Sequence, residues 1–180
     1  MALDFPASPL APALRLLEEG RDREAEALLQ TSQEGLPEAE RLALLGFVEA
    51  RKGNLRAYRA LALEAARRAQ TPLTLYHLGL ALPPKVGALA LEEALHRFQG
   101  DPKAEARLAF ALARALRGLG RLREALGYAA LALARGFGSF ALLEWAWLAL
   151  LAEEDPPLPD LLRQVELLAL EGGTGLYARF

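Results

Sequence analysis

Apolar residues recur along most of this chain at the spacing of an amphipathic α-helix. Segments of about 11 to 17 residues place apolar side chains at i, i+3, i+4 and i+7, so that they share one helical face. Polar and charged residues fill the other positions. The pattern is clearest at Ala106, Ala109, Phe110, Ala113 and Leu116, and again at Leu122, Leu126, Ala129 and Leu133.

Start and stop signals separate these segments. Ser8-Pro9, Thr71-Pro72 and Asp101-Pro102 each offer a capping oxygen followed by proline, which suits a first helical position. Glycine, which can close a last turn in the left-handed conformation, stands at or near the expected helix ends. These glycines are Gly20, Gly53, Gly87, Gly100, Gly120 and Gly136. The punctuation predicts ten helices of fewer than 20 residues, joined by tight turns.

Four of the glycines recur at a nearly fixed period. Gly20, Gly53, Gly87 and Gly120 are separated by 33, 34 and 33 residues. Each is expected between the two helices of one hairpin. A fixed step of this length is typical of a helical solenoid, in which each hairpin buries its apolar face against its neighbours.

The residues around these glycines resemble the tetratricopeptide repeat, a 34-residue helical hairpin. Small residues of the expected kind stand at Gly46, Gly79 and Ala113, and Ala94 and Phe98 match the second helix of the third unit. The resemblance covers about residues 6–171. It implies an all-α fold, a right-handed α-solenoid of about five antiparallel helix pairs, with 1–171 as one domain and 172–180 as a flexible or docking tail.

Three places depart from the repeat. Tyr58 occupies a position where the repeat has alanine, which predicts a locally wider helix pair. The segment 83–87 is expected to lengthen the third turn and shift the next helix by two or three positions. Pro156, Pro157 and Pro159 replace the short turn of the fifth unit. Both loops could be recognition loops, although tolerance of extra length at a surface explains them as well.

Composition narrows the function. The chain has no isoleucine and three valines, which argues against a β-sheet core, and no cysteine, which excludes disulfides and thiolate metal sites. A formal net charge of -2 favours neither direct nucleic-acid binding nor binding to an anionic membrane. The most apolar run, 137–152, is too short to span a bilayer, and the amino terminus does not resemble a signal peptide. We therefore expect a cytoplasmic protein; the scarcity of Asn, Met and Cys would suit a hot habitat.

No pattern of catalytic, metal-binding or cofactor-binding residues emerges, so we expect a protein that is not an enzyme. His77 and His96 lack ligands at helical spacing and are interpreted as packed or half-exposed helix residues. Adjacent carboxylates such as Glu92 and Glu93 diverge on a helix and do not form an acid/base pair. The glycines at 172–175 precede no helix and therefore do not form a phosphate loop.

The family resemblance implies a concave groove, lined by the first helix of each unit, that binds a peptide or a partner helix. Carried over position by position, it gives these candidate partner-binding residues: Phe47, Arg51, Tyr76, Leu80, Arg107, Phe110, Arg114 and Arg117. The last four, with Lys103, also form one basic stripe at steps of three and four. Arginines beside an aromatic ring suit carboxylates, so we expect an acidic protein or peptide partner, whose end could carry a free carboxylate. The alternative is a solvated face paired with Glu105 and Glu124.

A second candidate surface is the last hairpin. Trp145 and Trp147 point to different faces of one helix, so one ring needs a cover. Docking of the tail, through Leu176, Tyr177 and Phe180, is the first interpretation. Homodimerisation through this C-terminal hairpin is the second.

The prediction is therefore a non-enzymatic scaffold or adaptor for protein–protein interactions. Two alternatives stay open: a regulatory or sensor module that works with a separate DNA-binding protein in a bacterial transcription-regulator complex, and a homo-oligomeric structural protein. An enzyme would require an enclosed pocket with converging polar groups in place of an open groove.

Overall fold

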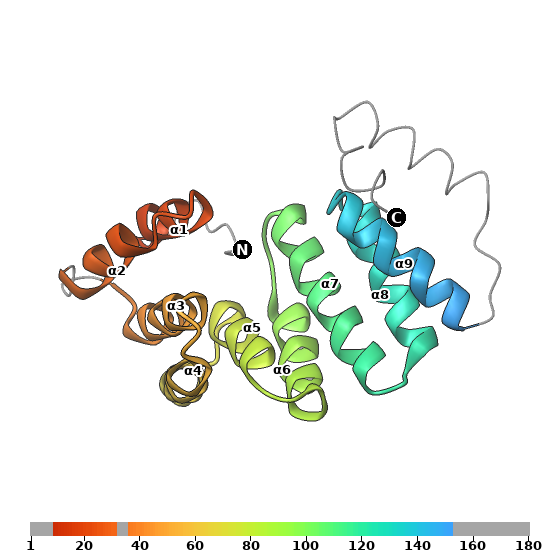
Figure 1. Cartoon of the computed structure of the whole chain (residues 1–180), viewed down its shortest axis with the longest axis horizontal. Helices are drawn as coiled ribbons and strands as arrows, with labels where there is room; N and C mark the ends of the chain where they lie inside the picture. Colours follow the sequence, from red (N-terminus) through yellow and green to blue (C-terminus); the bar gives the residue numbers. More distant parts are fainter. Residues whose placement is uncertain (1–8, 32–35, 153–180) are drawn as a thin grey trace. The chain divides into compact units, whose positions relative to one another are not determined.

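A computed structural model describes residues 9–31 and 36–152, and these residues form nine α-helices and no strand. The chain divides into two compact units, 1–104 and 105–180, whose boundary falls in the first turn of the seventh helix. Figure 1 shows the helices in order. The tenth predicted helix would lie outside the described residues, as do the proline turn at 156–159 and the tail.

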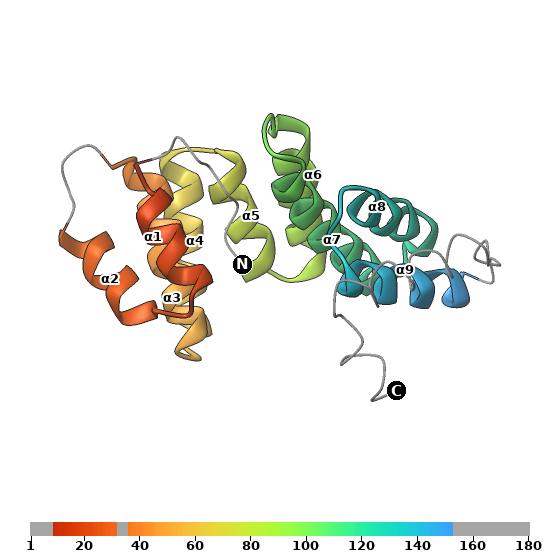
Figure 2. The same cartoon turned by 90° about the horizontal axis from the view of Figure 1, so that it is seen from above.

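The first unit contains three helical hairpins. They are α1 (Ala11–Glu18) with α2 (Asp22–Thr31), α3 (Glu38–Arg51) with α4 (Leu55–Arg68), and α5 (Pro72–Ala81) with α6 (Pro84–Arg97). Successive hairpins stack, since α2 contacts α3, while α3 and α4 both contact α5. Figure 2 shows the first unit from above. The predicted solenoid of antiparallel helix pairs is thus confirmed in this unit.

The second unit continues the pattern with α7 (Pro102–Gly118), α8 (Leu122–Ala134) and α9 (Ser139–Leu151). Helices α8 and α9 pack together. A cluster of buried alanines, Ala109, Ala132 and Ala141, takes one residue from each helix, and Phe110 and Phe137 pack against it. Small side chains let these three helices approach one another closely.

Three of the four periodic glycines close a helix as the sequence predicts. Gly20, Gly53 and Gly120 have φ of 75°, 85° and 74°, a region in which a side chain would be strained. In the second hairpin, the amide of Asn54 also donates to the carbonyl of Glu49 at 2.9 Å. This pairing is that of a Schellman cap, and it recurs after α1 and α7.

The fourth periodic glycine does not behave as predicted. Gly87 lies inside α6, and a Cβ added to it would come within 2.5 Å of the carbonyl oxygen of Gly79. A residue without a side chain is therefore required at this position because α5 and α6 cross there. The expected long turn is wrong as well: α5 ends at Ala81 and α6 begins at Pro84, because prolines 83 and 84 suit the start of a helix.

This short turn also removes the predicted shift of the following helix. Leu91, 12 residues after Gly79, packs against it, since a Cβ on Gly79 would lie 2.4 Å from Leu91 Cγ. Tyr58 stands at the same offset from Gly46, and its ring would lie 3.2 Å from a Cβ there. A glycine in the first helix thus makes room for a large side chain from the second helix in both hairpins.

The predicted cap at Thr71 is confirmed. The Thr71 hydroxyl accepts from the amide of Thr74 at 3.3 Å, and the Thr74 hydroxyl accepts from the amide of Thr71 at 2.9 Å. This reciprocal pair is a capping box, here with threonine in the place of the usual glutamate. It fixes where α5 begins and hence which of its residues face α3.

Candidate functional site

The first hairpins are joined by polar contacts near the candidate residue Arg51. Its guanidinium donates to the backbone carbonyl of Leu17 at 2.8 Å and pairs with Asp22. It also lies 4.8 Å from the centre of the Phe47 ring. Arg51 therefore connects α3 to the α1–α2 hairpin, and part of its charge is already neutralised.

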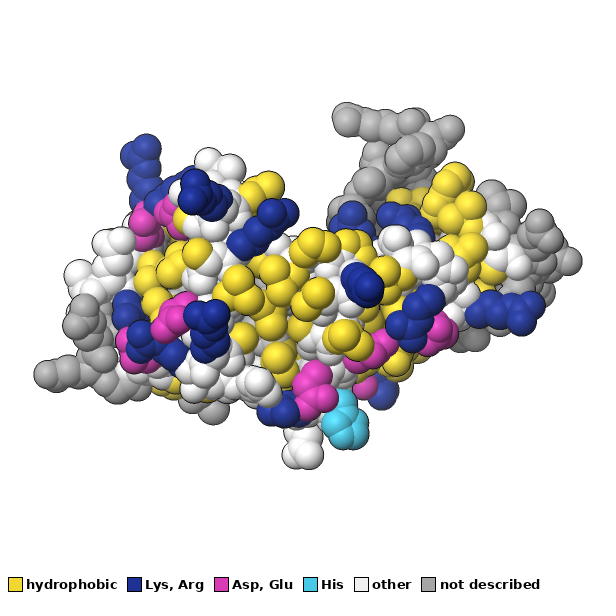
Figure 3. Space-filling view, turned by 90° about the horizontal axis from the view of Figure 1, so that it is seen from below, with side chains coloured by type: hydrophobic (Ala, Val, Ile, Leu, Met, Phe, Trp, Pro, Cys, Tyr) yellow, Lys and Arg dark blue, Asp and Glu magenta, His cyan; other side chains and the backbone are white. Residues whose placement is uncertain are grey.

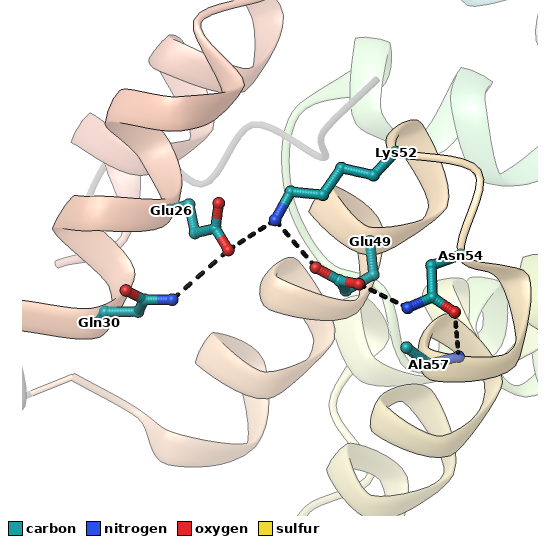
Figure 4. Close-up of polar contacts among 6 residues, drawn as sticks. All are labelled: Glu26, Gln30, Glu49, Lys52, Asn54 and Ala57. Carbon is teal, nitrogen blue, oxygen red and sulfur yellow. Dashed lines mark hydrogen bonds and ion pairs between the residues drawn. The ribbon is translucent and has the colours of Figure 1, made fainter.

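The neighbouring residue, Lys52, bridges the same two hairpins. Its ammonium group donates to Glu26 of α2 at 2.7 Å and to Glu49 of α3 at 3.0 Å. The second oxygen of Glu49 accepts from Asn54, whose own side-chain oxygen caps α4 at the amide of Ala57 (Figure 4). The network links a helix cap to the contact between hairpins.

An aromatic cluster that we call the His77 cluster (Phe47, Tyr58, Tyr76 and His77) lies between α3, α4 and α5. The His77 ring is fully buried, and its centre is 5.3 Å from those of Phe47 and Tyr76. The hydroxyl of Tyr58 lies 3.2 Å from His77 Nδ1 and 3.2 Å from the His77 carbonyl oxygen. The candidates Phe47 and Tyr76 thus both contact a histidine that the sequence analysis interpreted as an ordinary packed residue.

Hydrogen bonding determines the tautomer of His77. The Tyr58 hydroxyl has one hydrogen, which it donates to the carbonyl oxygen, so that Nδ1–H donates to the hydroxyl. Nε2 is then a bare acceptor, buried without a partner in the described part of the chain. Burial lowers the pKa of His77 to about 3 and raises that of Tyr58. Both side chains are neutral at pH 7.

The last candidate of this unit, Leu80, lies near the end of α5. It is 42% exposed, whereas Tyr76, one turn earlier, is 6% exposed. Phe47 is half-buried. Among the candidate residues of the first unit, those with free apolar surface for a partner are therefore Leu80 and Phe47.

In the second unit the predicted basic stripe on α7 divides into unlike parts. Arg114 is exposed, and Phe110, one turn before it, stacks on Phe137 with ring centres 4.7 Å apart. Arg107 is half-buried. Arg117 donates to Glu144 of α9 at 3.0 Å, so its charge is balanced within the unit.

Glu144 is a residue that sequence reasoning missed. It is 8% exposed; one carboxylate oxygen binds Arg117, and the other is buried without a hydrogen-bond partner among the described residues. Its only sequence signal was a single carboxylate within an apolar helix.

The alternative pairing of the stripe with Glu105 and Glu124 is wrong. These carboxylates bind Arg135 and Arg121 instead, with Glu105 lying 2.8 Å from its partner. Arg114 therefore has no carboxylate partner in the described part of α7, α8 and α9.

The C-terminal hairpin was expected to need a cover for one tryptophan. Trp145 is half-buried, and Trp147 is 52% exposed on α9. Leu151, one turn after Trp147, is also exposed. The tail residues proposed as a cover lie outside the described residues.

Within residues 9–31 and 36–152, no group of three or more His, Asp or Glu side chains could hold a metal ion. No helix among them combines the length and the hydrophobicity that crossing a membrane requires.

Comparison with known proteins identifies the fold. No family model matches the chain, and no curated protein matches it either. Solved structures do: "Crystal structure of YrrB: a TPR protein with an unusual peptide-binding site" matches with a TM-score of 0.63 and 19% identity, over 93% of this chain and 88% of that one. Two structures of MamA match at 16% identity, over 89% of this chain and 92% of each. They are "MamA RS-1 ArsTM double mutant", with a TM-score of 0.67, and "MamA 41-end from Desulfovibrio magneticus RS-1", with 0.64.

These likenesses confirm the expected fold. The chain is an all-α protein that resembles tetratricopeptide-repeat structures over most of its length. At 16% to 19% identity they establish the fold and leave the function to be argued from the surface.

Proposed function

We propose that this protein is a non-enzymatic scaffold that binds an acidic segment of a partner protein along the first helices of its repeats. The fold supports the proposal, because stacked hairpins present extended surfaces to partners. YrrB, a protein of this fold, has by its description an unusual peptide-binding site. A scaffold of this kind needs no cofactor, and the proposal includes none.

The observation that carries the acidic preference is the environment of Arg114. Its guanidinium is exposed without a carboxylate partner in the described residues, and it follows Phe110 by one helical turn. A guanidinium binds a carboxylate with two parallel hydrogen bonds and can also stack on an aromatic ring. Arg117 contributes less than the sequence suggested, since Glu144 already neutralises it.

Phe47 and Leu80 of the first unit supply apolar contacts, since both expose part of their side chains. Arg51 lies over the Phe47 ring, and Tyr76 is buried against His77. The first unit therefore offers apolar contacts to a partner, and the second unit offers an arginine that can bind a carboxylate.

A peptide array tests this function. Peptides of about 12 residues with acidic, neutral or basic sequences, each with a free or an amidated C-terminus, are probed with the full chain and with Arg114→Glu. We expect acidic peptides to bind, and the variant to lose about tenfold or more in affinity. Arg23→Glu is the matched control, because Arg23 is exposed on α2 without an ion-pair partner among the described residues. Equal binding of acidic and basic peptides would reject the proposal.

Self-association through the C-terminal hairpin is a second proposal, supported by Trp147 and Leu151. These exposed side chains stand four residues apart on α9 and so share one face. Light scattering should give a dimer mass that Trp147→Glu reduces to that of the monomer. A monomer mass for the unmodified chain at about 100 µM would contradict this proposal, since a stable dimer has a lower dissociation constant.

A further inference from the structure

A second surface of the first unit lies between α4 and α5. We call it the α4–α5 hollow; its lining includes Leu63, Ala66, Arg67 and Leu78, and its volume is about 460 Å³. Leu63 exposes 40% of its surface, which is unusual for a large apolar residue. Figure 3 shows hydrophobic side chains gathered over α4, α5 and α6 on the face seen from below, with Lys and Arg side chains around them. The hollow thus has an apolar floor that is open to solvent.

On α4, an arginine stands one helical turn before Leu63 and another one turn after it. Arg59, Leu63 and Arg67 follow one another at steps of four along α4, so they share one face of the helix. Arg59 Nε donates to the carbonyl oxygen of Ala81 at 3.1 Å, which holds the guanidinium at the end of α5. Arg67 lines the hollow together with Leu63.

Arg59 and Arg67 lack carboxylate partners of the kind that neutralise Arg68, the residue after Arg67. Arg68 pairs with Glu38 and with Glu64, at 2.6 Å and 2.9 Å. Neither Arg59 nor Arg67 has a carboxylate partner among the described residues, and α4 carries four arginines against one glutamate. The charge around the hollow is therefore positive in a chain whose net charge is -2.

The spacing of the arginines defines what fits. Eight residues of α-helix span about 12 Å, so two carboxylates of a partner must be about 12 Å apart, with an apolar side chain between them. A helix with Glu, Leu and Glu at steps of four presents these groups on one face. A hollow with an apolar floor and charged ends resembles the centre and rim of a protein interface more than a membrane-binding surface.

We propose that the α4–α5 hollow binds an amphipathic helix of a partner protein that inserts one apolar side chain over Leu63 and places a carboxylate on each side, against Arg59 and Arg67. This site is distinct from the one on the first helices and does not depend on Arg114. It would let the scaffold hold two partner segments at once.

Fluorescence anisotropy with a defined probe tests the proposal. The probe is a labelled helical peptide of about 17 residues, long enough to populate a helix, with Glu, Leu and Glu at four-residue steps. We expect saturable binding to the full chain, and a loss of about tenfold or more in Arg59→Glu/Arg67→Glu. A second probe with Lys, Leu and Lys should show the reverse preference and bind that variant better than the unmodified chain. This gain requires a folded variant and so separates lost charge from lost structure.

Arg15→Glu/Arg23→Glu is the matched control. Both residues are exposed in the first unit without an ion-pair partner in the described residues, and the control changes the net charge by the same amount. It should leave binding of the acidic probe unchanged, as should Arg114→Glu, which tests the other site.

Four results would overturn the proposal. They are the absence of saturable binding up to about 1 mM protein, equal affinity for the acidic and basic probes, an equal loss in the matched control, and displacement of the probe by self-association of the chain. Capture on vesicles of phosphatidylglycerol that the Arg59/Arg67 variant abolishes, without peptide binding, would assign the surface to a lipid instead.

Discussion

Tyr58 and His77 form a closed pair of hydrogen bonds in which the hydroxyl group is both donor and acceptor, at 3.2 Å to each partner. The pair joins α4 to α5 and thus the second hairpin to the third. Its members are 19 residues apart and are both buried. A protonated imidazole at this position would have no water to solvate it, which makes the pair sensitive to pH.

Lowering the pH should therefore reduce the stability of the protein, and the loss should depend on His77. Its pKa is about 3 when folded and about 6.5 when unfolded, so the unfolded chain binds one more proton between these values. The contribution to stability is complete above pH 6.5 and is lost as the pH falls below it, at up to about 1.4 kcal/mol per pH unit. The free energy of unfolding measured in urea should be about 2 kcal/mol lower at pH 5.0 than at pH 7.5 because of this residue alone.

The variant His77→Phe should remove that difference, while His96→Phe, at an exposed position, should keep it. A pH dependence that is unchanged in His77→Phe would show that the imidazole is not buried in the neutral form.

Glycine-to-alanine replacements should destabilise the protein at Gly79 and Gly87 and stabilise it at Gly127. Gly79→Ala and Gly87→Ala each place a methyl group within 2.5 Å of atoms of the facing helix, which should cost about 1 to 3 kcal/mol of unfolding free energy. Gly127 in α8 has no atom within 4 Å of its added Cβ, so Gly127→Ala should stabilise by about 0.5 to 1 kcal/mol through helix propensity. Thermal unfolding monitored by circular dichroism measures all three. A neutral Gly87→Ala would contradict the close crossing of α5 and α6.

The pair of Arg117 and Glu144 should behave as a structural pair. Arg117→Met leaves a buried carboxylate without its cation, which should cost about 1 to 3 kcal/mol. The double variant Arg117→Met/Glu144→Leu should recover most of this loss, because no buried charge remains. A double-mutant cycle gives the coupling; if the two single changes are additive, Arg117 is free for a partner after all.

Arg51 and Lys52 should differ in their contribution to stability although they are adjacent. Arg51→Met removes a hydrogen bond to the Leu17 carbonyl and should cost about 1 to 2 kcal/mol. Lys52→Met removes only ion pairs of an exposed ammonium, which solvent screens, and should therefore cost clearly less than Arg51→Met. Chemical denaturation compares them, and a larger loss for Lys52 would reverse the assignment of the main contact between the hairpins.

The sequence predicts the architecture well, because the positions of the helices and turns depend on local signals. The period of Gly20, Gly53 and Gly120 reports backbone conformations that only glycine adopts easily, and it places three turns correctly. Gly87 fits the same period for another reason, the crossing of two helices, and a one-dimensional pattern cannot distinguish the two.

The candidate site is only partly visible in the sequence. Helical spacing correctly places Phe110 and Arg114 on one face of α7. It does not show that Glu144, 27 residues after Arg117, binds it, or that Phe47 of α3 packs against His77 of α5. Such contacts depend on which hairpin faces which, and side-chain spacing within one helix carries no information about that.

The most direct test of the scaffold function is a nuclear magnetic resonance titration of the labelled full chain with the best acidic peptide from the array. Amide shifts should change around Phe47 and Leu80 on α3 and α5, and around Phe110 and Arg114 on α7, and Arg114→Glu should abolish the changes on α7. Shift changes confined to α2, α6 and α8, or none at a saturating peptide concentration, would contradict binding along the first helices.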